Sequence, residues 1–110
     1  MAVVSPFTPS GNTVTFTANT SAPSAVQAVS TTLGGNQYRI INNGTVTVFL
    51  GYGATASDAA NAATVITTNG NAFPLLPNTD EILSFAPNAY FTGITSSGNA
   101  SIYITPGDGL

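Results

Sequence analysis

The scarcity of charge is the most informative feature of this 110-residue chain. It has four acidic residues, one basic residue (Arg39) and no histidine. Charged residues make up 5% of the chain, against about 25% in an average soluble domain. Binding a nucleic-acid backbone or an anionic membrane surface needs several lysines or arginines. We therefore expect neither nucleic acid nor a membrane as a partner.

Cysteine is absent too, which excludes disulfides and thiolate metal sites. Without histidine and cysteine, the usual nucleophile–base pairs and metal-activated waters cannot be assembled. Asp80 and Glu81 are adjacent and would point to opposite faces of a strand, a poor start for a catalytic carboxylate pair. Asp80 with Glu81, Asp58 or Asp108 would be the acids of a calcium site completed by backbone carbonyls. Because these acids are scattered along the chain, a turn cap for Asp80 and a helix cap for Asp58 are the simpler explanations. We predict no enzyme activity, no metal and no cofactor.

With so few charges, the polar surface must consist mainly of Thr, Ser, Asn and Gly. Protein molecules with such a surface repel one another only weakly. Such a composition favours a protein that packs against other copies of itself or against a large scaffold. The alternative is a secreted domain that resists proteases. No apolar run approaches the roughly 20 residues of a membrane span, and the first residues lack the basic start of a signal peptide. The absence of cysteine, and thus of disulfides, fits synthesis in a bacterial cytoplasm.

Alternation of apolar and polar residues between turn-forming clusters predicts short β-strands along most of the chain. The expected strands are residues 14–18, 25–32, 37–42, 45–52, 64–67, 72–76, 81–85, 89–95 and 100–105. The alanine-rich residues 53–63 would form a short capped helix or an irregular loop. This pattern predicts an all-β fold, a single-domain antiparallel β-sandwich of the jelly-roll type.

Two local patterns give sharper predictions. Asn43-Gly44 between two strand-like runs predicts a hairpin with a type I′ turn, in which both central residues have positive φ. Ile102 and Ile104 with Tyr103 between them predict a late strand that is buried on one face and covered on the other.

The N-terminal residues 1–12 predict an extended arm, and residues 13–110 the sandwich domain. Pro6 and Pro9 would stiffen this arm, and Val3, Val4 and Phe7 would be its apolar anchors. An extended segment of this kind can add main-chain hydrogen bonds to an exposed sheet edge of a partner.

Two other sets of side chains are candidates for binding. Arg39, as the single cation, would pair with Asp80, Glu81 or Asp58, or with a carboxylate of a partner, although a surface arginine without a special role is as good an interpretation. The four tyrosines would form either a sugar-stacking platform or half-buried sandwich packing; they are Tyr38, Tyr52, Tyr90 and Tyr103.

Three stretches resemble one known group of proteins. They are YRIINNGTVTVFLGYG at residues 38–53, PLLPNTDEILSF at residues 74–85, and the ending from residue 90, which closes in SGNASIYITPGDGL at residues 97–110. This pattern, over roughly residues 36–110, is similar to small capsid decoration (cement) proteins of tailed, podovirus-like bacteriophages.

The resemblance implies a jelly-roll structural protein on the exterior of the virion capsid, which stabilises the phage head by binding across capsomer seams. It implies the major capsid protein and further copies of the chain, as a dimer or trimer, as partners. The arm residues Val3, Val4, Pro6, Phe7 and Pro9 would then contact the capsid. The alternative is a glycan- or receptor-binding module of a phage tail spike or fibre.

Overall fold

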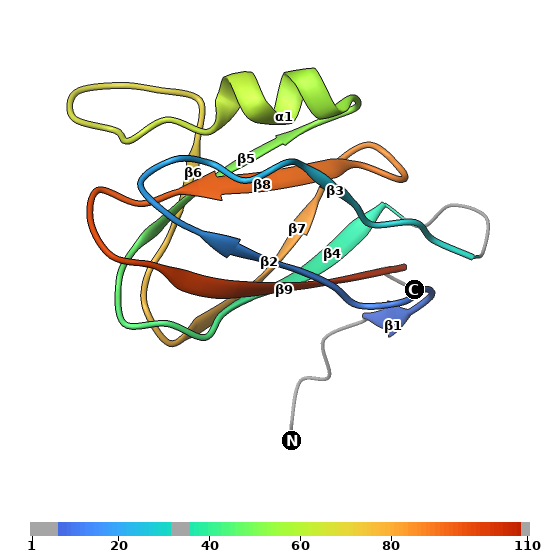
Figure 1. Cartoon of the computed structure of the whole chain (residues 1–110). Coiled ribbons are helices and arrows are strands. Elements are labelled where there is room, and N and C mark those ends of the chain that lie inside the picture. Colours follow the sequence, from blue (N-terminus) through green and yellow to red (C-terminus); the bar gives the residue numbers. More distant parts are fainter. Residues whose placement is uncertain (1–6, 32–35, 109–110) are drawn as a thin grey trace.

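The computed structural model describes residues 7–31 and 36–108, which form two antiparallel β-sheets packed face to face (Figure 1). Sheet A contains β1 (Thr8–Pro9), β2 (Val14–Ala18), β4 (Gln37–Asn42), β7 (Thr79–Ser84) and β9 (Ala100–Asp108). Sheet B contains β3 (Val26–Gln27), β5 (Val48–Gly53), β6 (Phe73–Leu75) and β8 (Tyr90–Ile94). The predicted all-β sandwich is therefore confirmed.

The strand pairs are nested along the chain. β5 pairs with β6, β4 with β7, β3 with β8 and β2 with β9, and every pairing is antiparallel. β9 also pairs with β4 on its other edge, and β8 with β5. The result is an order of β2-β9-β4-β7 in sheet A and β3-β8-β5-β6 in sheet B.

The core lies between the two sheets and follows the period-2 alternation of the strands. In β4, Tyr38 and Ile40 are fully buried, whereas Arg39 between them is exposed. The other large core side chains come from both sheets; among them are Val48, Leu50, Leu75, Phe91, Ile102 and Ile104.

An aromatic cluster closes one part of this core. The rings of Tyr38 and Phe91 meet edge to face with centroids 5.0 Å apart, and Tyr52 stacks on Phe85 at 4.1 Å. The Tyr38 hydroxyl donates a hydrogen bond to the Ala86 carbonyl at 2.6 Å and accepts one from the Ala89 N–H at 3.1 Å. Both polar functions of this buried phenol are thus satisfied, as a buried hydroxyl requires.

Helix α1 (Ala56–Ala62) covers the outer face of sheet B (Figure 1). Its N-cap is Thr55, whose side chain accepts a hydrogen bond from the Asp58 N–H at 3.1 Å, so the helical alternative for residues 53–63 is the observed one. The helix can approach closely because β5 offers Gly51, where a Cβ atom would lie 2.2 Å from the Ala59 carbonyl oxygen. In the described part of the chain, no helix is long and apolar enough to cross a membrane.

The predicted hairpin at Asn43-Gly44 is wrong. β4 and β5 belong to different sheets, so residues 43–47 form a crossover rather than a turn, and neither Asn43 nor Gly44 has positive φ. Glycine is needed here for space, because a Cβ on Gly44 would lie 2.3 Å from the Cβ of Ala100. The buried side chain of Asn42 holds the crossover: its Oδ1 accepts from the Gly44 N–H and its Nδ2 donates to the Val46 and Leu75 carbonyls, each at 3.0 Å.

Three smaller predictions also need correction. Residues 64–67 form no strand, and the weak strand predicted over 25–32 is reduced to the two residues of β3. Tyr103 is 37% exposed, so the strand around it is covered on one face alone within the described chain. Other strands lie close to their predicted positions: 37–42 coincides with β4, and 14–18 with β2.

Candidate functional site

The N-terminal arm is the first candidate site. Val3, Val4 and Pro6 lie outside the described residues, so their predicted contacts stay predictions. Pro9 belongs to β1, where it lies opposite Gly107 of β9. Ser10 continues this attachment, because its N–H donates to the Pro106 carbonyl at 2.9 Å. The expectation that residues 1–9 form an unpaired arm is therefore wrong for Thr8 and Pro9, which pair with β9.

Phe7 marks the place where the described chain begins on sheet A. Its ring lies against the backbone of β9, since a Cβ on Gly107 would come within 2.5 Å of it. Phe7 also lines a shallow depression of about 540 Å³ together with four residues of β4 and β7, namely Arg39, Asp80, Glu81 and Ile82. The ring is thus part of the outer surface of sheet A rather than a free anchor.

Arg39 pairs with Asp80, one of its three predicted partners. Its Nη2 donates to a carboxylate oxygen of Asp80 at 2.7 Å, and the two side chains are 49% and 52% exposed. An ion pair this exposed contributes about 0–1 kcal/mol, because water and salt screen it. The pair therefore sets the charge pattern of the surface more than it stabilises the fold.

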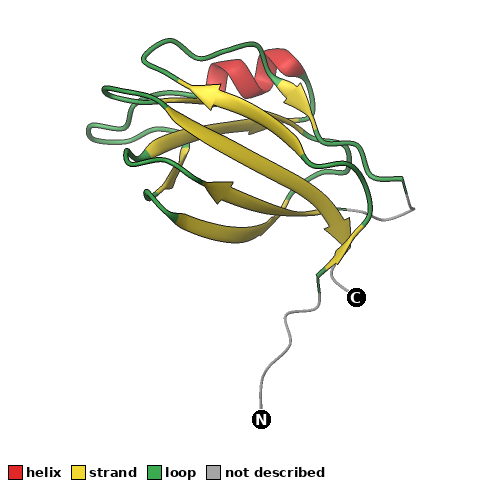
Figure 2. Ribbon diagram, turned by 60° about the horizontal axis from the view of Figure 1, so that its bottom comes forward, coloured by secondary structure: helices red, strands yellow, loops and turns green. Residues whose placement is uncertain are grey.

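The outer face of sheet A surrounds this ion pair and is named here the sheet A face. In the strand register, Tyr103, Ile41 and Asp80 form one row across β9, β4 and β7, and Thr105, Arg39 and Ile82 form the next. These side chains lie on the opposite side of sheet A from the buried Ile40 and Ile104. Figure 2 turns this side toward the viewer, and α1 lies on the other side of the sandwich.

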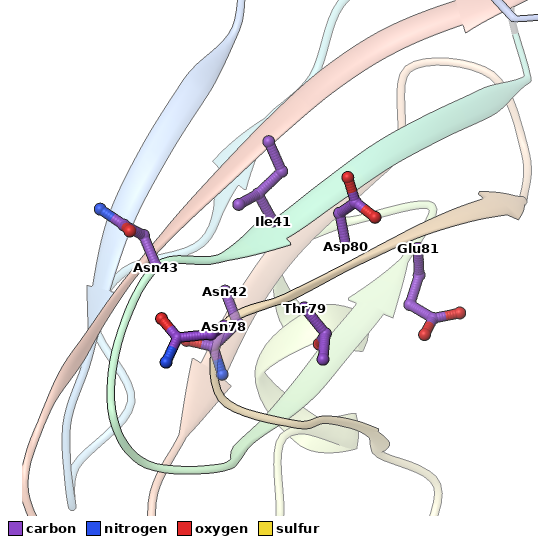
Figure 3. Close-up of a pocket in the computed structure, with 7 residues that line it drawn as sticks. All are labelled: Ile41, Asn42, Asn43, Asn78, Thr79, Asp80 and Glu81. Carbon is purple, nitrogen blue, oxygen red and sulfur yellow. The ribbon is translucent and has the colours of Figure 1, made fainter.

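A polar depression of about 510 Å³ lies where β7 begins, at the edge of sheet A (Figure 3). Its lining residues are Ile41, Asn42, Asn43, Asn78, Thr79, Asp80 and Glu81. Figure 3 shows that Asp80 and Glu81 leave the strand on opposite sides, as the sequence predicts for adjacent strand residues. The depression thus wraps around the strand edge and offers amide and carboxylate groups.

The tyrosines do not form one platform. Tyr38 is fully buried, and burial raises the pKa of its phenol above the ordinary value of 10.0, partly opposed by the hydrogen bond from the Ala89 N–H. Tyr52 stacks on Phe85 at the core, whereas Tyr103 is exposed on the sheet A face. The interpretation as sandwich packing holds for Tyr38 and Tyr52.

Asp80 and Glu81 line the same two depressions, whereas Asp58 lines a different one. In residues 7–31 and 36–108, no three side chains of the His, Cys, Asp or Glu types come together in a way that could hold a metal ion.

Two features were not identified from the sequence. The hydrogen-bonding role of Asn42 was not predicted, because the adjacent Asn43-Gly44 pair is typical of a hairpin turn and was interpreted as one. The sheet A face was hidden because strand order is needed to place Tyr103, Ile41 and Ile82 together.

Comparison of the chain with protein-family models, curated proteins and solved structures found no significant match.

Proposed function

We propose that this chain is a structural protein of a bacteriophage virion, a decoration (cement) protein that binds the exterior of the head across the seams between capsomers. Its partners in this proposal are the major capsid protein and further copies of itself, as a dimer or trimer. It would be made in the bacterial cytoplasm and would act by binding alone, without a catalytic step.

The observation that carries the proposal is the nested strand pairing. When one long hairpin folds over on itself, its strands divide between two sheets in the order observed here, with sequence-distant strands as neighbours. We infer from this order that the sandwich is a jelly roll, an architecture that recurs in viral capsid proteins and in lectins. Because one fold serves many functions, the resemblance of residues 38–53 and 97–110 to decoration proteins is what favours the head.

The physical requirement of this role is a body that resists deformation when the head is under pressure. In the described residues, every buried side-chain nitrogen and oxygen has a hydrogen-bond partner, so the interior holds no polar group that would favour rearrangement. Capsid contact in this proposal is made by the arm before β1, with Val3, Val4 and Pro6 as contact residues.

The first test is the copy number of the protein in purified virions, measured by quantitative mass spectrometry against the major capsid protein. Abundance comparable to that of the capsid protein is the expected result. A handful of copies per particle would instead indicate a tail or spike protein. Absence of the protein from virions would overturn any virion role.

The second test is a deletion of residues 2–6. The deletion stops before Phe7 because Thr8 and Pro9 pair with β9, and removing them would damage sheet A itself. The truncated protein should keep the thermal stability of the full chain and lose co-sedimentation with heads that lack the protein. Unchanged binding to these heads would show that the arm does not make the capsid contact.

A second candidate function, recognition of a host glycan by a tail module, is favoured by the polar depression of Figure 3. Amide and carboxylate groups are suitable partners for sugar hydroxyls, but none of its lining residues is aromatic. Saturable glycan binding by the isolated protein, lost in Glu81→Gln and Asn43→Ala and kept in the distant Asn99→Ala, would favour this function over the head.

A further inference from the structure

We propose that the sheet A face is a homotypic interface, at which two copies of this chain pack face to face about a two-fold axis. The inference names the self-contact surface of the proposed structural role and rests on that role for its purpose. The observations that support it belong to the isolated protein: one sheet face without a covering helix, its apolar residues, its charge pattern and its size.

The two outer faces of the sandwich differ in what covers them. Helix α1 covers sheet B, whereas no helix of the described chain covers the outer side of sheet A (Figures 1 and 2). Arg39, Asp80 and Ile82 on that side are exposed. Two of the four exposed large hydrophobic side chains of the described chain lie on the sheet A face, Ile82 at 40% and Tyr103 at 37% exposure. Ile41 lies directly opposite Tyr103 and diagonally to Ile82, whose register partner on β4 is Arg39. Exposed apolar side chains that gather on one face beside polar residues are typical of a protein contact.

The charges on this face identify the occupant as a second copy. Arg39 and Asp80 lie side by side, and each side chain is about half exposed. A two-fold axis between them brings Arg39 of each copy next to Asp80 of the other copy. The dimer then contains two equivalent Arg39–Asp80 contacts across the interface. A partner with a uniformly acidic or basic surface would satisfy one of the two and repel the other. The charge pattern of this face is therefore complementary to the same face of a second copy.

The edge of sheet A is a poorer route to self-association. β7 is the edge strand, and pairing it with β7 of a second copy would bring the carboxylates of Asp80 and Glu81 from both copies close together. Charges on edge strands are a common means by which proteins prevent such edge-to-edge pairing. The charge pattern therefore opposes contact through the edge and permits contact through the face.

The area of the face is adequate for a weak dimer. The strands of this face, β2, β4, β7 and β9, have five, six, six and nine residues. At about 3.4 Å per residue and about 4.8 Å between strands, they cover roughly 420 Å² per copy, or about 850 Å² in total. This total is below the roughly 1,000 Å² of a stable, specific interface, so the contact is a weak and transient one. Such a contact would be populated where many copies are concentrated on one scaffold.

The test is sedimentation velocity of the purified full chain over a range of concentrations. The wild type should show a reversible monomer–dimer equilibrium. Ile82→Asp should weaken dimerisation by about tenfold or more, because it buries a charge in the apolar patch. The matched control is Leu76→Asp, since Leu76 is 60% exposed but lies outside the face. Equal weakening in both variants would overturn the assignment.

A charge exchange identifies the second copy as the partner. Arg39→Asp and Asp80→Arg should each dimerise about tenfold or more weakly than the wild type, because like charges then meet across the axis. A mixture of the two single variants should form heterodimers at wild-type strength, and the double variant should recover as well. Failure of the mixture to associate would overturn the two-fold pairing, even if both single variants are impaired.

The same measurements separate this inference from the proposed function. A chain that stays monomeric at every concentration but is abundant on phage heads would overturn the inference and leave the capsid role in place. A chain that dimerises through this face but is absent from virions would do the reverse.

Discussion

At the scale of single residues, the buried phenol of Tyr38 connects the core to the turn between β7 and β8. Replacing Tyr38 by Phe keeps the ring packing but removes the donor to Ala86 and leaves the Ala89 N–H without its acceptor. We expect the free energy of unfolding to fall by about 1–3 kcal/mol, measured by urea denaturation. In Tyr90→Phe, the hydroxyl removed has no hydrogen bond within the described chain, so a loss there as large as in Tyr38→Phe would contradict this explanation.

The same phenol predicts how stability depends on pH. Burial raises the pKa of Tyr38 in the folded state, so above about pH 10 the unfolded chain releases a proton that the folded chain keeps. The unfolded state then binds fewer protons, and the free energy of unfolding falls as the pH rises above about 10. The chain has no histidine, cysteine or lysine, so we expect little change between about pH 6 and 9.

Denaturation curves at a series of pH values would check this profile. The alkaline fall should be reduced in Tyr38→Phe, because that variant has no phenol to titrate at this position. A cooperative loss of stability near neutral pH would contradict the prediction.

Asn42 is the residue on which the crossover between the sheets depends. Asn42→Ala leaves three main-chain groups without this partner: the Leu75 carbonyl in the interior, and the Val46 carbonyl and Gly44 N–H in part-buried places. We expect a loss of about 2–4 kcal/mol in chemical denaturation. The neighbouring Asn43→Ala is a matched control, since Asn43 is exposed and its N–H bond to Ser101 is kept. A cost below about 1 kcal/mol for Asn42→Ala would show that water can replace the amide.

At the scale of elements, helix α1 stays on sheet B because β5 has no side chain beneath it at Gly51. In Gly51→Ala the new Cβ would lie 2.2 Å from the Ala59 carbonyl oxygen and 2.6 Å from the Ala63 nitrogen, so the helix must move away. We expect a loss of about 1–3 kcal/mol and faster hydrogen exchange at the Ala59 and Ala63 amides. Gly70→Ala should cost less, because the new Cβ there meets side-chain atoms of Thr64 and Ile66 at 3.2 Å.

The elements also show how far local sequence patterns extend. Residues 37–42 are predicted correctly because the buried Tyr38 and Ile40 alternate with Gln37 and Arg39, although Ile41 and Asn42 reverse this pattern. β1 gives no signal, because a two-residue strand that contains Pro9 has no periodicity to detect. The Asn43-Gly44 hairpin fails because the same residues suit a tight turn and a crossover, and the choice depends on which partners surround Asn42. The sheet A face could not be predicted, because it depends on which strands are neighbours.

At the scale of the whole molecule, the nested pairing predicts the order in which the sandwich folds. The innermost pair, β5 with β6, closes the loop over residues 54–72, whereas β2 and β9 bring Ala18 opposite Ala100. Two doublings of loop length cost about 1.2 kcal/mol in closure entropy. Folding dominated by such distant contacts takes milliseconds to seconds. We therefore expect the inner pairs to form before the outer ones.

Stopped-flow folding and unfolding of two core variants would measure this order. Val48→Ala in β5 should mainly slow folding, because the inner pair is part of the transition state, and Phe16→Leu in β2 should mainly speed unfolding. The chain contains no cysteine, so disulfide formation cannot limit the folding rate. If instead Phe16→Leu slowed folding and Val48→Ala left it unchanged, the outer pair would form first. Loop closure would then not set the order, and early contact between the two ends of the chain would be needed to explain how the sandwich assembles.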